Sequence, residues 1–504
     1  NNTTGSQNVA VGAFALDANT TASNNTAFGY AALTANTTGT QNVAVGANAL
    51  DAADTNNNTA VGFEAMTNST ASECVAVGSR ALKAHTSGAR NSALGSEAAT
   101  AVTTADDITA IGRSSLAACT TGSSNTALGS KSLMANTTGG SNVAVGANAL
   151  NANTTANNNT AVGYQSLLSN TTGNNNLAMG REAMSVNTTG DNNTAIGSQA
   201  LDANTTADNN TAVGRSALGA NTTGTSNTAV GKGCLDANTT ANNNTGVGQS
   251  ALSGNTTGAS NTAMGSGALE NNTTASNNTA FGNFALGVNT TGANNVAVGP
   301  GALDANTTGS SNNALGVDAL GAATTADANN AFGRRALNSC TTGGGNSAFG
   351  HDSGKEITTG SNNVLLGSDA GRSSSPSGSI TTGSNNVVLG NNNISDAFIK
   401  VAFTVTSDQR DKIEDGVVSH GLDFVNQLKP KSFWFRKNRD SDEKHGDKRY
   451  GFYAQDILAL EGSDSVIIDS KDSDNLKFKG DQLIPVLVNA IKELSAKVTA
   501  LEAG

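Results

Sequence analysis

Small and bulky apolar residues recur in one short pattern from the N-terminus to about residue 390. In this pattern an alanine is followed by a bulky apolar residue and then by a glycine, as in Ala161, Val162 and Gly163. The glycine returns after 17 residues at nearly every step, with two steps of 16 and one of 23. A fixed period of this length is typical of a solenoid in which every repeat adds one turn.

Each repeat contains the pattern of one short strand. Its alternation places the alanines on a tight side and residues such as Val11, Phe28 and Val45 on a roomier side. A second apolar pair, for example Ala217-Leu218, predicts another strand or a corner, and the Asn-Thr-Thr-Gly stretch that follows has turn chemistry. We therefore predict a mainly β fold in which residues 1–395 form a parallel β-solenoid, a β-roll of 17-residue repeats. Its uncovered apolar face suggests lateral association of identical chains.

The pattern changes near residue 407. The apolar run 397–405 predicts one more strand, so we assign 396–406 as a connecting strand. Residues 407–504 are rich in charge, contain the only Trp and predict a small α+β domain. Within it, "GVVSHGLDFVNQL" has helical spacing, "KSFWFRK" and "KRYGFYAQDI" have the pattern of strands, and 481–502 is the clearest helix.

The terminal helix carries an apolar seam in which the residues are four and three positions apart. The seam consists of Leu487, Ile491, Leu494, Val498 and Leu501. Two heptads are too short for a stable isolated helix, so the seam predicts a helical coiled coil within a homotrimer. The alternative is that these side chains pack into the core of their own subunit.

Composition and charge narrow the range of functions. The net charge of −11 argues against a nucleic-acid partner, and no apolar run is long enough for membrane insertion. The repeats offer no recurring pair of carboxylates for glycan cleavage. The cysteines and histidines show no ligand spacing, so we expect no metal and no cofactor. The cysteines, expected to be buried or half-buried thiols, are Cys74, Cys119, Cys234 and Cys340.

Stacked Thr-Thr pairs predict rows of hydroxyl groups along the solenoid. We expect Thr and Asn ladders that satisfy the hydrogen bonds of the coil. An ice-binding solenoid is a less favoured alternative, because the Thr pairs stand beside Asn and Gly in a predicted turn and the phase drifts at Ala53-Asp54-Thr55.

The repeat module N-x-A-x-G-x-x-A resembles the repeats of the left-handed parallel β-roll heads of trimeric autotransporter adhesins, and also repeats in phage tail fibres. The resemblance implies a left-handed, trimeric solenoid. The period of 17 is longer than that of the usual adhesin repeat.

The C-terminal motifs resemble a second family. "SDQRDK", "LKPKSFWFR", "RYGFYAQDI" and "LKFKGDQLIPVLVNAIKEL", in this order, are similar to the C-terminal intramolecular chaperone domain of phage endosialidase tailspikes and tail fibres. The motif residues include Gly451, Phe452, Ala454 and Gln455. The resemblance implies a domain that trimerises, templates the folding of the fibre before it, and then cuts itself off at its first serine.

Carried over by position, the scissile bond joins Thr406 to Ser407. Ser407 is then the nucleophile and Lys412 its base, a role that a lysine can fill in its neutral form, and Asp408 and Arg410 orient the site. The chain would be an autoproteolytic serine/lysine peptidase that acts on itself only. The alternative is that Ser407 is a helix N-cap and Lys412 a solvated surface residue.

These observations favour a phage tail fibre or tailspike that attaches to a host surface. Its expected partners are two further copies of the chain, a glycan or protein receptor on the host cell, and other tail proteins of the virion. It would be assembled in the host cytoplasm and reside in the virion tail. A trimeric adhesin on a bacterial cell surface is the alternative.

Overall fold

The computed structural model describes residues 1–398, 400, 407–436, 439, 441–463, 465–471, 473–474 and 476–504. The chain divides into two compact units, Asn1–Gly345 and Asn346–Gly504. The predicted mainly β class is confirmed, because 23 short strands form one solenoid sheet. Strands β1 to β20 lie in the first unit and β21 to β23 in the second.

Every solenoid strand has three residues. The strands are β1 (Val9–Val11), β2 (Thr26–Phe28), β3 (Val43–Val45), β4 (Thr59–Val61), β5 (Val75–Val77), β6 (Ser92–Leu94), β7 (Thr109–Ile111), β8 (Thr126–Leu128), β9 (Val143–Val145), β10 (Thr160–Val162), β11 (Leu177–Met179), β12 (Thr194–Ile196), β13 (Thr211–Val213), β14 (Thr228–Val230), β15 (Thr245–Val247), β16 (Thr262–Met264), β17 (Thr279–Phe281), β18 (Val296–Val298), β19 (Asn313–Leu315), β20 (Asn330–Phe332), β21 (Ser347–Phe349), β22 (Val364–Leu366) and β23 (Val387–Leu389).

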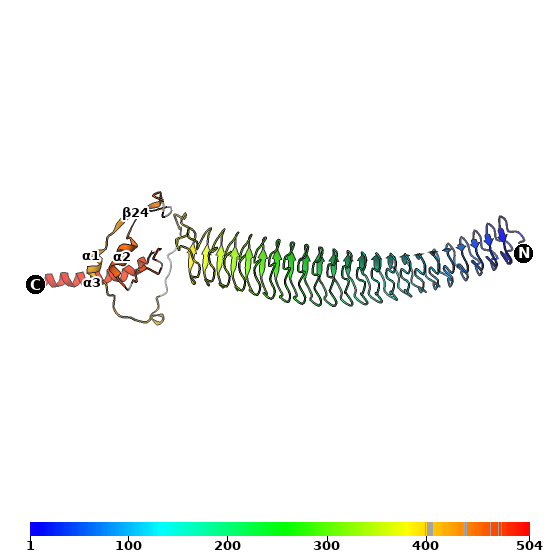
Figure 1. Cartoon of the computed structure of the whole chain (residues 1–504), viewed down its shortest axis with the longest axis horizontal. Helices are drawn as coiled ribbons and strands as arrows, with labels where there is room; N and C mark the ends of the chain where they lie inside the picture. The colour runs from blue at the N-terminus through cyan, green and yellow to red at the C-terminus, as the bar shows by residue number, and fades with distance from the viewer. Residues whose placement is uncertain are drawn as a thin grey trace. The chain divides into compact units, whose positions relative to one another are not determined.

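Consecutive strands pair in parallel with a register of one repeat. Thr160 lies beside Leu177, Ala161 beside Ala178 and Val162 beside Met179. Figure 1 shows the strands of successive rungs side by side along the first unit. Because each rung pairs with the next copy of its own sequence, one 17-residue pattern is sufficient to specify all the rungs.

The solenoid core is thin and is filled by small residues and leucines. The central alanine of almost every strand is fully buried, and so is the leucine of the second apolar pair, as with Ala161 and Leu167. The bulky residue after the alanine points outward and stays partly exposed, as with Phe28 and Met179. The row formed by this position is called the apolar row below.

The second apolar pair forms a corner and not a strand. Leu167 has φ 48° and Gln165 has φ 56°, both in the left-handed region. The corner starts at the repeat glycine, Gly163, where φ is 135°. A Cβ there would lie 2.5 Å from the carbonyl oxygen of Gly180 on the next rung, so only glycine fits.

Two ladders of buried asparagines hold the rungs together. In the first, Asn221 Nδ2 donates to Asn204 Oδ1 at 3.1 Å and to the carbonyl of Gly224 at 2.9 Å. In the second, Asn142 Nδ2 donates to the carbonyl of Ala156 at 2.8 Å. The hydroxyl of the first Thr in each pair adds a third ladder, as where Thr137 donates to the carbonyl of Thr154 at 3.0 Å. These ladders satisfy polar groups that the narrow core shields from water.

The C-terminal part of the second unit has α and β elements. They are a 3₁₀ turn η1 (Gln409–Asp411), α1 (Leu422–Gln427), β24 (Lys431–Arg436), β25 (Lys444–Gly451), α2 (Ala454–Glu461), β26 (Ile468–Asp469), β27 (Lys477–Phe478), a second 3₁₀ turn η2 (Gly480–Gln482) and α3 (Leu483–Glu502). Strands β24 and β25 form an antiparallel hairpin. The segment "KRYGFYAQDI" is therefore only half strand, because its second half opens α2.

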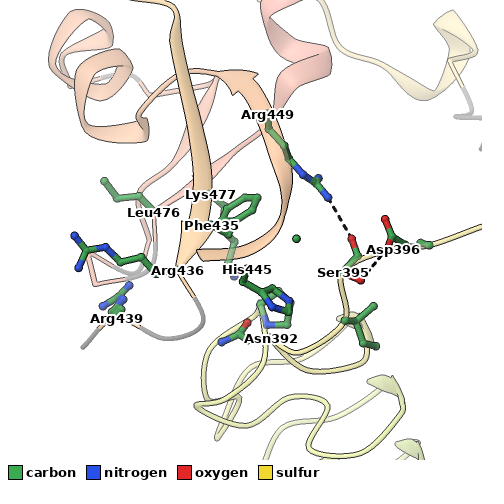
Figure 2. Close-up of a pocket in the computed structure, with 14 residues that line it drawn as sticks. Asn392, Ser395, Asp396, Phe435, Arg436, Arg439, His445, Arg449, Leu476 and Lys477 are labelled. Atoms are coloured by element: carbon green, nitrogen blue, oxygen red, sulfur yellow. Dashed lines mark hydrogen bonds between the residues drawn. The ribbon is translucent and has the colours of Figure 1, made fainter. Parts of the chain in front are cut away.

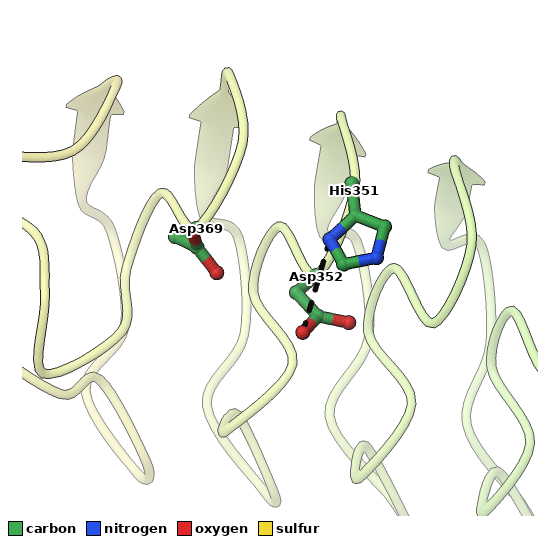
Figure 3. Close-up of side chains that lie close together, drawn as sticks. All are labelled: His351, Asp352 and Asp369. Atoms are coloured by element: carbon green, nitrogen blue, oxygen red, sulfur yellow. Dashed lines mark ion pairs between the residues drawn. The ribbon is translucent and has the colours of Figure 1, made fainter.

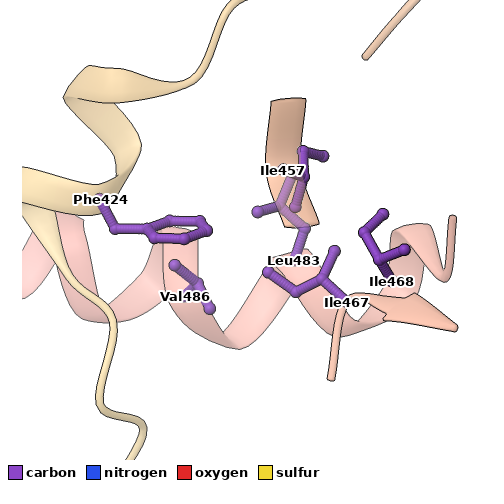
Figure 4. Packing of buried hydrophobic residues seen from close by; sticks show 6 residues of the cluster. All are labelled: Phe424, Ile457, Ile467, Ile468, Leu483 and Val486. Carbon is purple, nitrogen blue, oxygen red and sulfur yellow. The ribbon is translucent and has the colours of Figure 1, made fainter. Parts of the chain in front are cut away.

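A small core joins α1, α2, β26 and α3. Figure 4 shows its six buried side chains, which are Phe424, Ile457, Ile467, Ile468, Leu483 and Val486. Helix α3 contributes Leu483, Val486 and Ala490 to the buried interior. The apolar seam lies elsewhere on α3, and Ile491 and Leu501 are 66% and 81% exposed. In this chain, then, the seam is not part of its own subunit's core.

The predicted connecting strand 396–406 falls mostly outside the described residues. Residues 396–398 have no regular secondary structure, and Ile399 and residues 401–406 are not described. Thr406, on the acyl side of the predicted scissile bond, is among them.

Candidate functional site

Ser407 and Lys412 lie at the two ends of one short turn. Asp408 caps η1, because its Oδ1 accepts a hydrogen bond from the backbone N–H of Arg410 at 2.9 Å. The turn brings Lys412 back toward its starting point, and Lys412 Nζ lies 2.5 Å from Ser407 Oγ and 3.4 Å from the carbonyl oxygen of Ser407. The cap is therefore Asp408 and not Ser407, and the serine hydroxyl is left to contact the lysine.

Asp408 and Arg410 form an ion pair beside this contact. Arg410 donates from its terminal nitrogen to Asp408 Oδ2 at 2.6 Å. The hydrogen bond from Arg410 holds the pKa of Asp408 below its usual range, and the Asp408 carboxylate raises the pKa of Arg410. The Arg410 guanidinium thus pairs with Asp408, and this ion pair restrains the turn that begins at Ser407.

All four residues of this turn are exposed. Ser407, Asp408, Arg410 and Lys412 each face solvent in the single chain. A nucleophile and a base in contact are the minimum needed for acyl chemistry, and the exposed turn by itself does not exclude water.

The motif Gly451, Phe452, Ala454 and Gln455 connects β25 to α2 and serves packing. Phe452 and Ala454 pack against the small core, whereas Gln455 is exposed. A Cβ at Gly451 would lie 3.1 Å from the ring of Phe433, so glycine leaves room for that ring.

Glu461 is a site residue that the sequence did not reveal. Its buried carboxylate, at the end of α2, accepts hydrogen bonds from the backbone N–H groups of Val466, Ile467 and Ile468 at 2.8, 2.5 and 2.9 Å. It holds the chain entering β26 against the core. Because all three donors are backbone groups, no side-chain motif marks the contact.

Asn489 and Glu493 of α3 hold the start of α1. Glu493 Oε2 accepts from the backbone N–H of Leu422 at 2.7 Å, and Asn489 Nδ2 donates to the carbonyl of His420 at 3.0 Å. Glu493 thus takes the place of a local N-cap, since Gly421 has no side chain to offer. These contacts tie the helix that carries the apolar seam to the segment following the Ser407 turn.

A cavity of about 520 Å³ lies in the second unit (Figure 2). Basic side chains line it, among them Arg436, Arg449 and Lys477, and Arg449 donates to the backbone carbonyl of Ser395 at 3.3 Å. Neither Ser407 nor Lys412 is among the lining residues, so the cavity is separate from the turn that holds Ser407.

His351, Asp352 and Asp369 are grouped closely enough to suggest a metal site, as Figure 3 shows. The guanidinium of Arg372 already forms ion pairs with both of these carboxylates. Arg372 lies 3.1 Å from Asp352 and 2.5 Å from Asp369, and it also contacts Glu356 at 3.3 Å. We therefore interpret the group as an ion-pair network that closes the last solenoid turns. Among the described residues, no helix has the length and apolarity needed to cross a bilayer.

A long parallel solenoid followed by a small α+β domain defines a fibrous protein with a separate C-terminal module. Residues 407–464 match the family model described as chaperone of endosialidase, and the match begins at Ser407. No curated protein and no solved structure matches the chain. The C-terminal segment is thus a chaperone-of-endosialidase domain, and together with the solenoid it fits a protein of the phage tail fibre or tailspike type.

Proposed function

We propose that the chain is a homotrimeric fibre of a phage virion that attaches to a host cell surface, and that its C-terminal domain cuts the chain between Thr406 and Ser407. The observation that carries the cleavage proposal is the contact of 2.5 Å between Lys412 Nζ and Ser407 Oγ, at the first residue of the chaperone match. Other virion tail proteins and a surface receptor are the further partners in this proposal.

The cleavage proceeds by acyl transfer. Lys412, as the neutral amine, takes the hydroxyl proton while Ser407 Oγ attacks the carbonyl carbon of Thr406. The C–N bond then breaks, the α-nitrogen of Ser407 takes the proton, and an ester joins Thr406 to Ser407 Oγ. Water hydrolyses the ester, which leaves a new carboxylate on Thr406 and a free serine hydroxyl.

The proposed chaperone solves a register problem. Rungs with nearly the same sequence can pair one repeat out of step at little cost, and three chains must start together. A trimer formed at the C-terminus sets the register once. Removal of the domain then takes away the route by which the fibre would unfold, so the fibre becomes kinetically stable.

The test is intact mass spectrometry and a denaturing gel of the freshly expressed chain beside Ser407→Ala and Lys412→Ala. We expect the wild type to give the fragments 1–406 and 407–504, because only it has both nucleophile and base. Both variants should remain full length.

Asn426→Ala is the matched control, since this exposed residue of α1 lies outside the Ser407 turn and outside the chaperone motifs. It should be cleaved like the wild type. A single full-length band for the wild type, or cleavage in either site variant, would sink the assignment of Ser407 and Lys412.

A further inference from the structure

The basic cavity of the second unit has two walls that come from opposite sides of the proposed scissile bond. One wall is formed by residues of 392–397, which follow the last solenoid strand, β23, and are called the upstream segment below. The other wall is the hairpin of β24 and β25, with Phe435, His445 and Arg449 among its lining residues (Figure 2). The chaperone domain therefore contacts chain that lies before its own first residue.

Arg449 is the side chain that reaches across the cavity. Its terminal nitrogen donates to the backbone carbonyl of Ser395 at 3.3 Å, as Figure 2 shows. Its guanidinium carbon lies 5.6 Å from the centre of the Phe435 ring, which is a cation–π distance. Phe435 on β24 thus supports the Arg449 guanidinium, and the guanidinium binds the upstream segment.

A bulge in the hairpin brings its backbone against the same residue. Phe433 pairs with Arg449 whereas Phe435 pairs with His445, so extra residues of β25 oppose a single residue of β24. Gly446 is one of these extra residues and has φ 70°. A Cβ at Gly446 would lie 3.9 Å from the Cβ of Ser395. This approach is a second contact with the upstream segment, independent of the Arg449 side chain.

The charges of the two walls are complementary. Asp396 is the only charged residue of the upstream segment, and its Oδ2 accepts a hydrogen bond from the Ser395 hydroxyl at 2.8 Å. The opposite wall carries Arg436, Arg449 and Lys477. Opposite charges attract more strongly across a partly enclosed space than in bulk water. The cavity thus favours this acidic segment of the same chain as its occupant.

The proposed cleavage needs a restraint on this side of the scissile bond. Ser407 Oγ must approach the carbonyl carbon of Thr406 from outside the peptide plane, so the rate depends on the orientation of that peptide. The turn capped by Asp408 restrains only the Ser407 side. A connection of about a dozen residues that is held at both ends samples far fewer orientations than one held at a single end.

We propose that the β24–β25 hairpin binds the upstream segment and thereby orients the scissile peptide, with Arg449 as a positioning residue for the cleavage. Arg449 touches neither reacting atom, so it acts through the backbone of Ser395. This inference rests on the proposed self-cleavage and assigns it a second set of residues.

The first experiment follows the cleavage of the pulse-labelled full chain after cell-free translation. Arg449→Met keeps a long side chain that can pack on the Phe435 ring but cannot donate to Ser395, and we expect about tenfold slower cleavage. Arg449→Lys keeps a donor and should be cleaved within about threefold of the wild-type rate. If Arg449 served only to pack on the ring, the methionine variant would be as active as the lysine variant.

Lys448→Met is the matched control for this experiment. It removes the same charge from the next residue of β25, and Lys448 lies over the ring of Trp434 and not among the residues that line the cavity. This variant should be cleaved like the wild type.

A disulfide tests the contact itself. Ser395→Cys combined with Gly446→Cys should be joined by oxidation with copper phenanthroline, because a Cβ separation of 3.9 Å suits a disulfide. The fragments 1–406 and 407–504 should then stay together on a denaturing gel until they are reduced. Each single substitution is a control, and Gly446→Cys alone also measures the effect of a side chain at φ 70°. Added to Arg449→Met, the crosslink should restore the cleavage rate, because it holds the upstream segment in place of the arginine.

Each result decides between the two proposals. Cleavage of Arg449→Met at the wild-type rate overturns the positioning role and leaves self-cleavage standing, and so does a crosslink that forms without restoring the rate. Two cysteines that do not join in a chain that is still cleaved show that the contact with the upstream segment is wrong. A wild type that stays full length overturns the proposed self-cleavage, and the role of Arg449 with it.

Discussion

His85 occupies a position that asparagine holds in most other rungs of the first ladder. It is fully buried, with Nδ1 3.0 Å from Ser69 Oγ and Nε2 2.9 Å from Asn91 Nδ2. Since the Asn91 amide also gives a hydrogen bond to the carbonyl of Ala105, its nitrogen is a donor, and His85 Nε2 must be the acceptor. Burial lowers the pKa of His85, while a backbone hydrogen bond with Gly88 and the nearby Asp106 charge act in the opposite direction.

This geometry predicts local acid sensitivity. Below about pH 6.5 an unfolded histidine binds a proton. The folded His85 resists that proton, because a charged ring would be buried and would face the Asn91 donor. The unfolded state therefore binds more protons, and stability falls as the pH falls. After correction for the intrinsic exchange rate, which itself falls as the pH falls, the amides of the rungs around His85 should be less protected from hydrogen exchange at pH 5 than at pH 7.5.

His85→Asn restores the ladder residue and should remove this pH dependence. The rung of Asn221 serves as an internal control, because no histidine lies near it in the sequence. An equal loss of protection at both rungs, or an unchanged response in His85→Asn, would show that His85 is not the sensor.

At the scale of the element, each rung is stabilised by ladders of asparagine hydrogen bonds, and a ladder ends where another residue replaces the asparagine. The longest unbroken stretch of the first ladder runs from Asn136 to Asn306, and the next rung then has Ala323 in place of asparagine. Asn306 Oδ1 is buried without a hydrogen-bond donor, as is Asn36 Oδ1, which faces Ala53 on its next rung. Each missing asparagine thus leaves one buried carbonyl unsatisfied, a destabilising feature.

Asn221→Ala should open its rung locally. The change removes hydrogen bonds to Asn204 and Gly224 and leaves Asn238 Nδ2 with one acceptor fewer. We expect a loss of about 1–3 kcal/mol in the free energy of local opening, measured by hydrogen exchange of that rung and its neighbours. Thr223→Ala on the same rung changes an exposed hydroxyl and should cost less than about 0.5 kcal/mol. If both changes cost the same, the ladder is not what stabilises the rung.

At the scale of the whole molecule, α3 has two functions on two faces. One face completes the core of its own chain, and the other exposes the apolar seam. An exposed stripe of this kind is stabilised by contact with other copies of the helix. We therefore assign the seam to the proposed trimer and the buried face to the fold of the monomer.

Ile491→Lys combined with Leu494→Lys should separate these functions. Introduced in the Ser407→Ala chain so that the domain stays attached, the pair places charges in the seam and should convert a trimer into monomers by native mass spectrometry. The buried face with Val486 and Ala490 is untouched, so α3 should remain helical. Lys492→Ala, an exposed change outside the seam, should keep the trimer. A monomeric Ser407→Ala chain, or a trimer that survives both lysines, would contradict the assignment of the seam to the trimer.

Much of the fold was predictable because the solenoid is repetitive. A rung's neighbour is the next copy of its own sequence, so alternation, the repeat glycine and the Thr and Asn rows already specify the strand, the parallel register and the ladders. The change of composition at Ser407 likewise marked the start of the segment that the chaperone model matches. The contact of Lys412 with Ser407 could be anticipated because the two residues lie within one turn of chain, and their catalytic roles stay a prediction.

Contacts between distant segments were decided only by the tertiary structure. Glu493 caps α1 from 71 residues away in the sequence. Glu461 accepts hydrogen bonds from three backbone N–H groups, and no sequence motif indicates this contact. The leucine of each repeat occupies a left-handed corner, although the pattern also allowed a strand, because the next rung's backbone fixes its conformation. The period of the sequence thus determined the contacts between successive rungs. The contacts within the C-terminal domain were decided only by three-dimensional packing, because they join residues whose separation in the sequence follows no period.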